Sequence, residues 1–321
     1  MNTNVIFDTC AYRNLTLNCS VSEIEEKLKN IRMAEAEKGL TVHLSVIVLT
    51  ELLYHLSKNE QDLNERDNCL NGIVASILHG RNQTGIKYEF KYRPSLNNIV
   101  LNDIFDIIDE NEKIYNDSVL RVCDDITNEI LKGKTIEQIK DNSEIANAIE
   151  INHINCIENR INEFEIFTQI IKGFNPNVNL EKSEIGDQKI YKSLTKGQGK
   201  EEKFASIMAK TYLHGTAQYF KKYNLSVSEN EMKLFISIYK SAMKNMQDFF
   251  IKFNAGTKFN DLNRDIWNTI NDSHILMNCY VKNEKVILVT GDQKMKYETS
   301  ANFQKMKIDE YLKILGTEHF F

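Results

Sequence analysis

Strand-like segments occur near the two ends of this 321-residue chain, whereas its long middle part reads as helical. Val5-Ile6-Phe7 is a short apolar run typical of a buried parallel strand, and a second strand is predicted at Thr41–Leu44. Near the C-terminus, strands are predicted at Lys285–Thr290 and Phe303–Ile308. Two such pieces far apart in the sequence predict one discontinuous α/β domain with a large helical insertion.

Helices are predicted around these strands and throughout the middle of the chain. The capping-box pattern of Ser20 and Glu23 opens a helix that runs through Glu37, and Ser45 caps another that runs to about Leu56. The apolar spacing predicts further helices at Ile99–Leu131, Ile145–Lys172, Phe204–Tyr223, Glu229–Phe253, Asp265–Val281 and Asp309–Leu315. We therefore expect an α/β domain of residues 1–58 and 262–321, with an all-α insertion of residues 59–261.

Composition excludes several classes of protein. The six cysteines show neither a CxxC pair nor the spacing of a disulfide framework, so neither zinc nor disulfides are expected. The N-terminus has no basic start followed by an apolar stretch, as a signal peptide would. No apolar run approaches the roughly 20 residues that cross a bilayer. We therefore expect a cytoplasmic protein without a membrane partner.

Four acidic residues lie at the ends of apolar segments or inside them: Asp8, Glu51, Asp272 and Asp292. Asp8 directly follows a predicted strand, and Asp292 follows another after one turn residue. Glu51 and Asp272 lie on helices, with apolar neighbours three and four residues away. Asp8 or Asp292 taken singly is also typical of a helix N-cap or an Asx turn. The repetition of this pattern in four separate elements favours a shared site.

The chemistry of such a site follows from electrostatic repulsion. Two carboxylates about 4 Å apart repel by roughly 4 kcal/mol at an effective dielectric constant near 20. A hard divalent cation with oxygen ligands removes that conflict. Because sites in open parallel α/β sheets form outside the carboxyl ends of the strands, we expect all four acids to meet there.

The order and context of these segments resemble the PIN-domain nucleases. The segments that carry the resemblance are Val5-Ile6-Phe7-Asp8-Thr9, Ser45–Leu52, Asn271–Leu276 and Val289-Thr290-Gly291-Asp292. The final Met306–Leu312 segment is also similar to the last strand and helix of that family. The roughly 200-residue helical insertion is a departure, because compact members of the family lack one.

The resemblance implies a PIN-like parallel sheet and hydrolysis of phosphodiester bonds, usually of RNA, with Mg²⁺ or Mn²⁺. It implies that Asp8, Glu51, Asp272 and Asp292 form the acidic site, as metal ligands and catalytic residues. Thr9 and Thr290 match positions that often support these acids. We therefore expect a metal-dependent endoribonuclease.

A basic stretch lies within the predicted insertion. Residues 185–258 contain 13 lysines and 6 acidic residues, a local charge of +7, although the whole chain carries −5. Positive charge follows a phosphate backbone, and aromatic rings stack on unpaired bases. A solvated, lysine-rich surface explains the pattern equally well. The candidate nucleic-acid-binding residues are Lys189, Tyr191, Lys192, Lys196, Lys221 and Lys222.

Two other functions remain open from the sequence. A PIN-like domain without activity would serve as a binding or scaffold protein, with the insertion recruiting a partner. A nuclease directed to DNA or to a nucleic-acid structure would use the same acids. Homo-oligomers and a protein inhibitor also stay open as partners.

Overall fold

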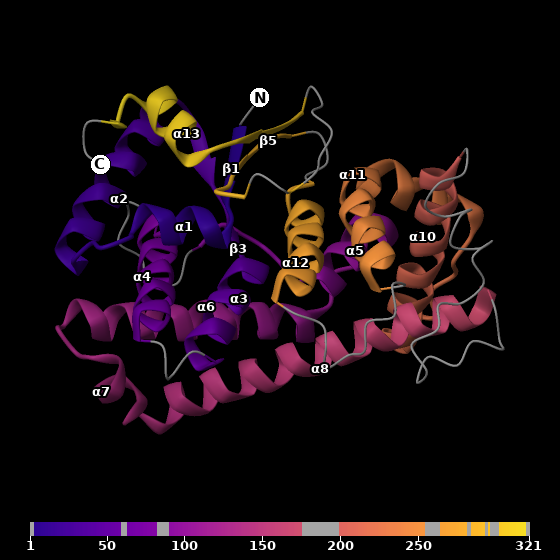
Figure 1. Cartoon of the computed structure of the whole chain (residues 1–321), viewed down its shortest axis with the longest axis horizontal. Helices are drawn as coiled ribbons and strands as arrows, with labels where there is room; N and C mark the ends of the chain where they lie inside the picture. The colour runs from indigo at the N-terminus through magenta and orange to yellow at the C-terminus, as the bar shows by residue number, and fades with distance from the viewer. Residues whose placement is uncertain are drawn as a thin grey trace.

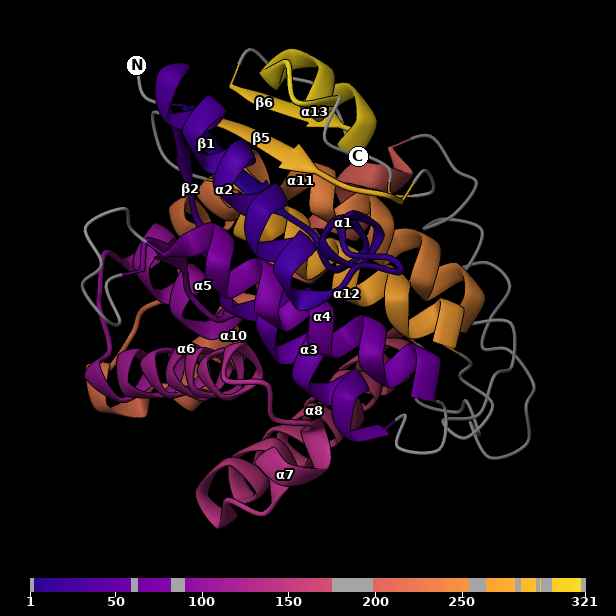
Figure 2. The ribbon, with the colours of Figure 1, turned by 90° about the vertical axis from the view of Figure 1, so that its left-hand side faces the viewer.

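The computed structural model describes residues 3–58, 63–81, 90–174, 199–253, 264–280, 284–292, 295 and 302–318. The fold is mixed α/β and mostly helical, with a small parallel sheet flanked by helices (Figure 1). In Figure 1 the long helices of the middle of the chain lie below the sheet and to its right, and in Figure 2 the magenta and pink helices again lie below it.

The main sheet has four parallel strands in the order β2-β1-β5-β6. Its strands are β1 (Thr3–Phe7), β2 (Leu40–Val42), β5 (Lys285–Val289) and β6 (Phe303–Met306). The two central strands come from opposite ends of the chain, and Phe7 lies opposite Val289. Because the strands are parallel, their carboxyl ends meet at one edge. That edge is therefore built from both ends of the sequence.

The first helices form as their sequences predict. Ser20 caps α2 with a complete capping box, in which its hydroxyl accepts from the Glu23 amide. Ser45 accepts from the Val48 amide at 3.3 Å at the start of α3. The helices near the sheet are α1 (Thr9–Leu15), α2 (Val21–Glu37), α3 (Val46–Lys58), α4 (Leu63–Gly80), α12 (Arg264–Asn278) and α13 (Ile308–Leu315).

The two faces of the sheet have different neighbours. On one face, the Phe7 ring packs against His79 of α4 at 4.6 Å, Tyr12 of α1 at 5.2 Å and Tyr311 of α13 at 5.4 Å between ring centroids. Side chains alternate between the two faces along a strand. The next residue, Asp8, therefore points to the other face.

The remaining helices fill the middle of the chain. They are α5 (Leu96–Phe105), α6 (Glu110–Leu131), α7 (Ile136–Lys140), α8 (Ser143–Phe174), α10 (Lys200–Tyr219), the 3-10 turn η2 (Lys221–Tyr223) and α11 (Glu229–Phe253). This part of the chain fastens the end of α12, because the Arg93 guanidinium donates to the carbonyls of Asn278 and Tyr280. Asn278 in turn donates to the Pro94 carbonyl at 2.8 Å.

Three details differ from the sequence predictions. The predicted strand Thr41–Leu44 is divided into β2 and β3 (Leu44–Ser45), and β3 pairs with the two-residue strand β4 (Tyr92–Arg93) inside the helical region. Two residues are too few to show strand periodicity. The predicted helix Ile99–Leu131 is interrupted at Asp106, which adopts a left-handed conformation with φ 55°. The predicted helix Ile145–Lys172 is slightly longer in the structure, where α8 covers Ser143–Phe174.

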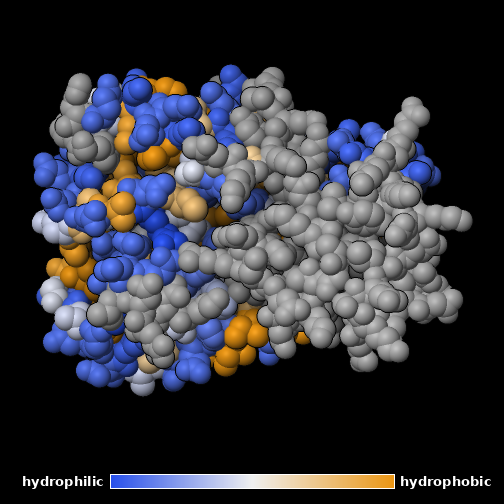
Figure 3. Space-filling model, viewed as in Figure 1, coloured by the Kyte–Doolittle hydropathy of each residue, from blue (hydrophilic) through white to orange (hydrophobic). Residues whose placement is uncertain are grey.

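The described surface is polar in character with separate apolar patches. On the face shown in Figure 3, the described residues are mainly hydrophilic and hydrophobic groups lie between them. None of the helices in the described ranges is both long enough and apolar enough to span a bilayer.

Candidate functional site at the carboxyl edge of the sheet

Asp8 and Asp292 come together through the hydroxyl of Thr290. The side chain of Asp8 is 2% exposed and caps α1, where it accepts from the Ala11 amide at 2.6 Å. Thr290, which follows β5, donates its hydroxyl to the other oxygen of Asp8 and accepts from the Asp292 amide at 2.9 Å. The N-cap interpretation of Asp8 is therefore correct, but it accounts for only one of its two carboxylate oxygens.

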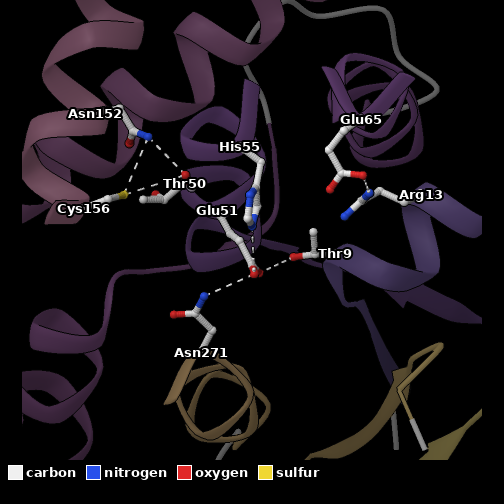
Figure 4. Close-up of polar contacts among 9 residues, drawn as sticks. All are labelled: Thr9, Arg13, Thr50, Glu51, His55, Glu65, Asn152, Cys156 and Asn271. Carbon is white, nitrogen blue, oxygen red and sulfur yellow. Dashed lines mark hydrogen bonds and ion pairs between the residues drawn. The ribbon is translucent and has the colours of Figure 1, made fainter. Parts of the chain in front are cut away.

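Glu51 is held by residues from three helices (Figure 4). Thr9 of α1 donates to one carboxylate oxygen at 2.5 Å, and Asn271 of α12 donates to the other at 3.1 Å. The Nε2 atom of His55, one turn further along α3, lies 3.7 Å from the same oxygen as Asn271. Glu51 thus connects α1, α3 and α12 at a single point.

The middle of the chain also contacts α3 next to Glu51. Asn152 of α8 donates to the backbone carbonyl of Thr50 at 3.0 Å, directly before Glu51 (Figure 4). On the opposite side, Arg13 of α1 pairs with Glu65 of α4 at 2.6 Å. The helices that carry the acids are therefore braced against neighbours from the helical part of the chain.

Asp272 of α12 completes the group through a side-chain hydrogen bond with Asp292. Burial raises the pKa of Asp272 to about 8, with further increases from the negative charges of Asp292, Glu51 and Asp8. Burial likewise raises the pKa of Asp8 to about 7, where the charges of Glu51 and Asp292 add to it and the Thr290 and Ala11 hydrogen bonds oppose it. The titration of each aspartate thus depends on the other acids.

Cys10 is not one of the four acids, but the negative charges of all four act on its thiol. It is an exposed residue, yet desolvation of its thiol and the negative charges of all four acids raise its pKa to about 12. Four residues from four separate elements therefore act electrostatically on one atom. We call Asp8, Glu51, Asp272 and Asp292 the acidic cluster.

Protons are unevenly distributed in the acidic cluster. Burial acts to raise the pKa of Glu51, but His55, Thr9 and Asn271 outweigh it, and the pKa falls below its usual value. The pKa of Glu51 is thus shifted in the opposite direction to those of Asp8 and Asp272, which hold their protons to higher pH. Pairs of carboxyl groups with pKa values pushed apart are frequent in functional sites, although structural networks also produce them.

The carboxylate oxygens are turned toward protein donors rather than toward one common point. Within the described ranges, no group of three or more His, Cys, Asp or Glu side chains is placed to hold a metal ion. Thr9, Thr290, Asn271 and the Asp272–Asp292 hydrogen bond account for these orientations. A cation bound here would have to replace these interactions and the protons.

The predicted nucleic-acid-binding residues fall into two groups. Lys189, Tyr191, Lys192 and Lys196 lie outside the residues that the structure describes. Lys222 forms a salt bridge with the buried Asp109, and its ammonium lies 4.9 Å from the centroid of the Tyr223 ring. Lys221 is exposed beside it. The described part of the basic stretch thus includes a lysine with a structural partner.

Sequence reasoning missed two residues that contact or approach the acidic cluster. Asn271 directly precedes Asp272, but an asparagine on a helix carries no signal of its own. The negative charges of Asp292, Asp8 and Asp272 act to raise the pKa of Lys305, which lies on β6. His55 is a buried histidine that also faces Glu51. His274, the other nearby histidine, lies 3.5 Å from the Tyr212 hydroxyl.

Comparison of the chain with protein-family models, curated proteins and solved structures finds no match.

Proposed function

We propose that the chain is a metal-dependent nuclease, and specifically an endoribonuclease, whose PIN-like domain consists of residues 1–58 and 262–321. The observation that carries the proposal is the acidic cluster, which gathers four carboxyl groups at the carboxyl edge of a parallel sheet. The cost of concentrating these groups needs an explanation, and a cation-dependent reaction supplies one.

The donor set suits a hard divalent cation. Asp8, Glu51, Asp272 and Asp292 offer oxygen ligands alone, which Mg²⁺ and Mn²⁺ prefer. Such a cation, when bound, activates water as a nucleophile and neutralises charge on the attacked phosphate. Thr290 and Thr9 orient Asp8 and Glu51 through hydrogen bonds. Asp8 and Asp272 would have to give up their protons for the four acids to hold such a cation.

One assay tests this proposal. The full chain is incubated with single-stranded RNA, single-stranded DNA and a flapped duplex, in Mn²⁺, Mg²⁺ or EDTA. We expect cleavage of RNA that requires the metal. Asp8→Asn should reduce the rate by about two to four orders of magnitude, as expected when several kcal/mol of transition-state stabilisation is lost.

The choice of variant keeps the fold intact, because asparagine caps a helix about as well as aspartate. The matched control is Asp309→Asn, at an exposed aspartate of α13, which should retain full activity. Cleavage of DNA but not RNA would assign a DNA-directed nuclease. A rise in Tm with Mn²⁺ but no cleavage of any substrate would favour an inactive, partner-binding domain. Cleavage unaffected by Asp8→Asn would reject the acidic cluster as the active site.

A further inference from the structure

Lys305 projects from the sheet on the same face as the acidic cluster. It lies opposite Leu288 of β5, and Leu288 lies opposite Ile6 of β1. Two residues further along these strands are Thr290 and Asp8. Since side chains two residues apart share a face, Lys305 points to the side of the sheet on which Asp8 and Thr290 meet.

The ammonium of Lys305 is hydrogen-bonded to a residue that follows β5 in the sequence. Its Nζ atom donates to the Met295 carbonyl at 2.8 Å, and Met295 is buried. Met295 lies three residues after Asp292, so this bond fastens the chain that follows β5. The lysine therefore links β6 to the segment that presents Asp292.

The positive charge of Lys305 also interacts with the acidic cluster. Burial lowers the pKa of Lys305, and the negative charges of Asp292, Asp8 and Asp272 act against that decrease. A partly buried ammonium near several carboxyl groups interacts with them more strongly than it would in water. These charges and the bond to Met295 act on the same atom.

We propose that Lys305 is a resident counter-cation of the acidic cluster, a positioning residue that holds the Asp292 segment and offsets the repulsion among the carboxylates. In the metal-free protein its ammonium supplies positive charge close to a group that contains four carboxyl groups. A divalent cation bound by the same acids would be repelled by that ammonium. Lys305 therefore stabilises the metal-free state and weakens the binding of the cation; the second effect rests on the proposed function.

Lys305→Met tests both effects, because methionine keeps much of the apolar stem and removes the charge. In EDTA, we expect Tm to fall by about 3 °C, a shift typical of one lost favourable interaction in a chain of this size. Mn²⁺ binding, measured by calorimetry, should tighten on the order of fivefold because a nearby like charge is gone. Lys305→Arg should restore the metal-free Tm. The control Lys285→Met, at the exposed start of β5, should change neither.

A double-mutant cycle in EDTA separates the charge from the anchor to Met295. If Lys305 acts as a counter-cation, its replacement should lower Tm less in an Asp292→Asn background than in the wild type. An equal loss in both backgrounds would overturn the proposal, as would Mn²⁺ binding weakened by Lys305→Met. If the wild type binds no Mn²⁺, the metal site of the proposed function fails, but the cycle in EDTA still decides the role of Lys305.

Discussion

Two polar clusters lie on opposite faces of β1, and they differ in how their carboxylates are satisfied. On one face, Glu35 accepts from the Tyr311 hydroxyl at 2.6 Å and lies 2.9 Å from Nε2 of His79. The Tyr12 hydroxyl lies 3.1 Å from Nδ1 of the same histidine. We call Glu35, His79, Tyr12 and Tyr311 the Glu35 cluster. On the other face lies the acidic cluster.

The Glu35 cluster has one carboxylate and several donors from different helices. All four of its residues are at most 2% exposed, so each polar group depends on a protein partner. The acidic cluster has four carboxyl groups, and part of its hydrogen bonding is between two of them. The first arrangement resembles an ordinary satisfied network, whereas the second carries repulsion that the protein alone does not remove.

This contrast separates a structural acid from a candidate functional one. A buried carboxylate that serves the fold is surrounded by enough donors to satisfy it. Carboxyl groups that serve a ligand are left with raised pKa values and with protons in place of the ligand. Local conflicts of this kind are expected at functional sites.

Glu35→Gln should produce the largest loss of stability. The amide removes the negative charge that accepts from Tyr311 and His79, and it leaves a buried donor without its former partner. We expect the free energy of unfolding to fall by about 2–3 kcal/mol, as for a broken buried charged network. Denaturant unfolding measures it. Glu37→Gln, at an exposed position of the same helix, is the control and should stay within about 0.5 kcal/mol. A loss equally small for Glu35→Gln would remove the distinction between the clusters.

The pH dependence of the stability of the metal-free protein should be the second-largest effect. The pKa of Asp8 is about 7 and that of Asp272 about 8, both well above those of an unfolded chain. The folded state therefore binds more protons than the unfolded state between about pH 4 and pH 8, and stability falls as pH rises through this window. The lowered pKa of Glu51 acts only at more acidic pH.

We expect the wild type in EDTA to lose at least about 2 kcal/mol between pH 5 and pH 8, since one pKa unit corresponds to roughly 1.4 kcal/mol. Denaturant unfolding at a series of pH values measures the slope. The Asp8→Asn and Asp272→Asn variants should each flatten it. A stability that increases steadily from pH 5 to pH 8 would show that the acidic cluster is ionised without cost.

The two clusters also differ in how far the sequence predicts them. Asp8 and Asp292 were predicted to meet because they follow apolar runs, and parallel pairing brings the ends of such strands to one edge. Glu35 was not singled out, because it lies among other acids on α2 and its partners are remote in sequence. Lys305 was missed because β6 has only four residues and mixes polar with apolar side chains. Local patterns thus locate strand ends, but they do not identify partners across the fold.

The ends of some helices were predictable because the signals that set them are local. Capping residues and helical spacing are local, so α2 and α11 have the predicted ends. The orientation of Glu51 was not predictable, since it depends on Thr9 and Asn271 from helices far apart in the chain. Whether the middle of the chain is a separate domain, as the sequence predicts, stays a prediction.

Asp272→Asn should give the smallest change in stability, with a sign opposite to that of Glu35→Gln. Asparagine keeps the shape of the side chain and removes a group that interacts unfavourably with Asp292, Glu51 and Asp8. We expect the metal-free protein at pH 8 to gain about 1–2 kcal/mol, as relief of a repulsion partly screened by water. Thermal and denaturant unfolding in EDTA measure the gain, with Asp309→Asn as the control.

Addition of Mn²⁺ should then make the wild type more stable than Asp272→Asn. A ligand stabilises the folded state in proportion to its occupancy, so Mn²⁺ should raise Tm more for the wild type than for Asp272→Asn. The same variant should lose cleavage, because a carboxylate of the proposed site is missing. If Asp272→Asn instead lowers the metal-free stability and Mn²⁺ shifts both proteins equally, Asp272 belongs with Glu35 as a structural acid. The acidic cluster would then have three functional members rather than four.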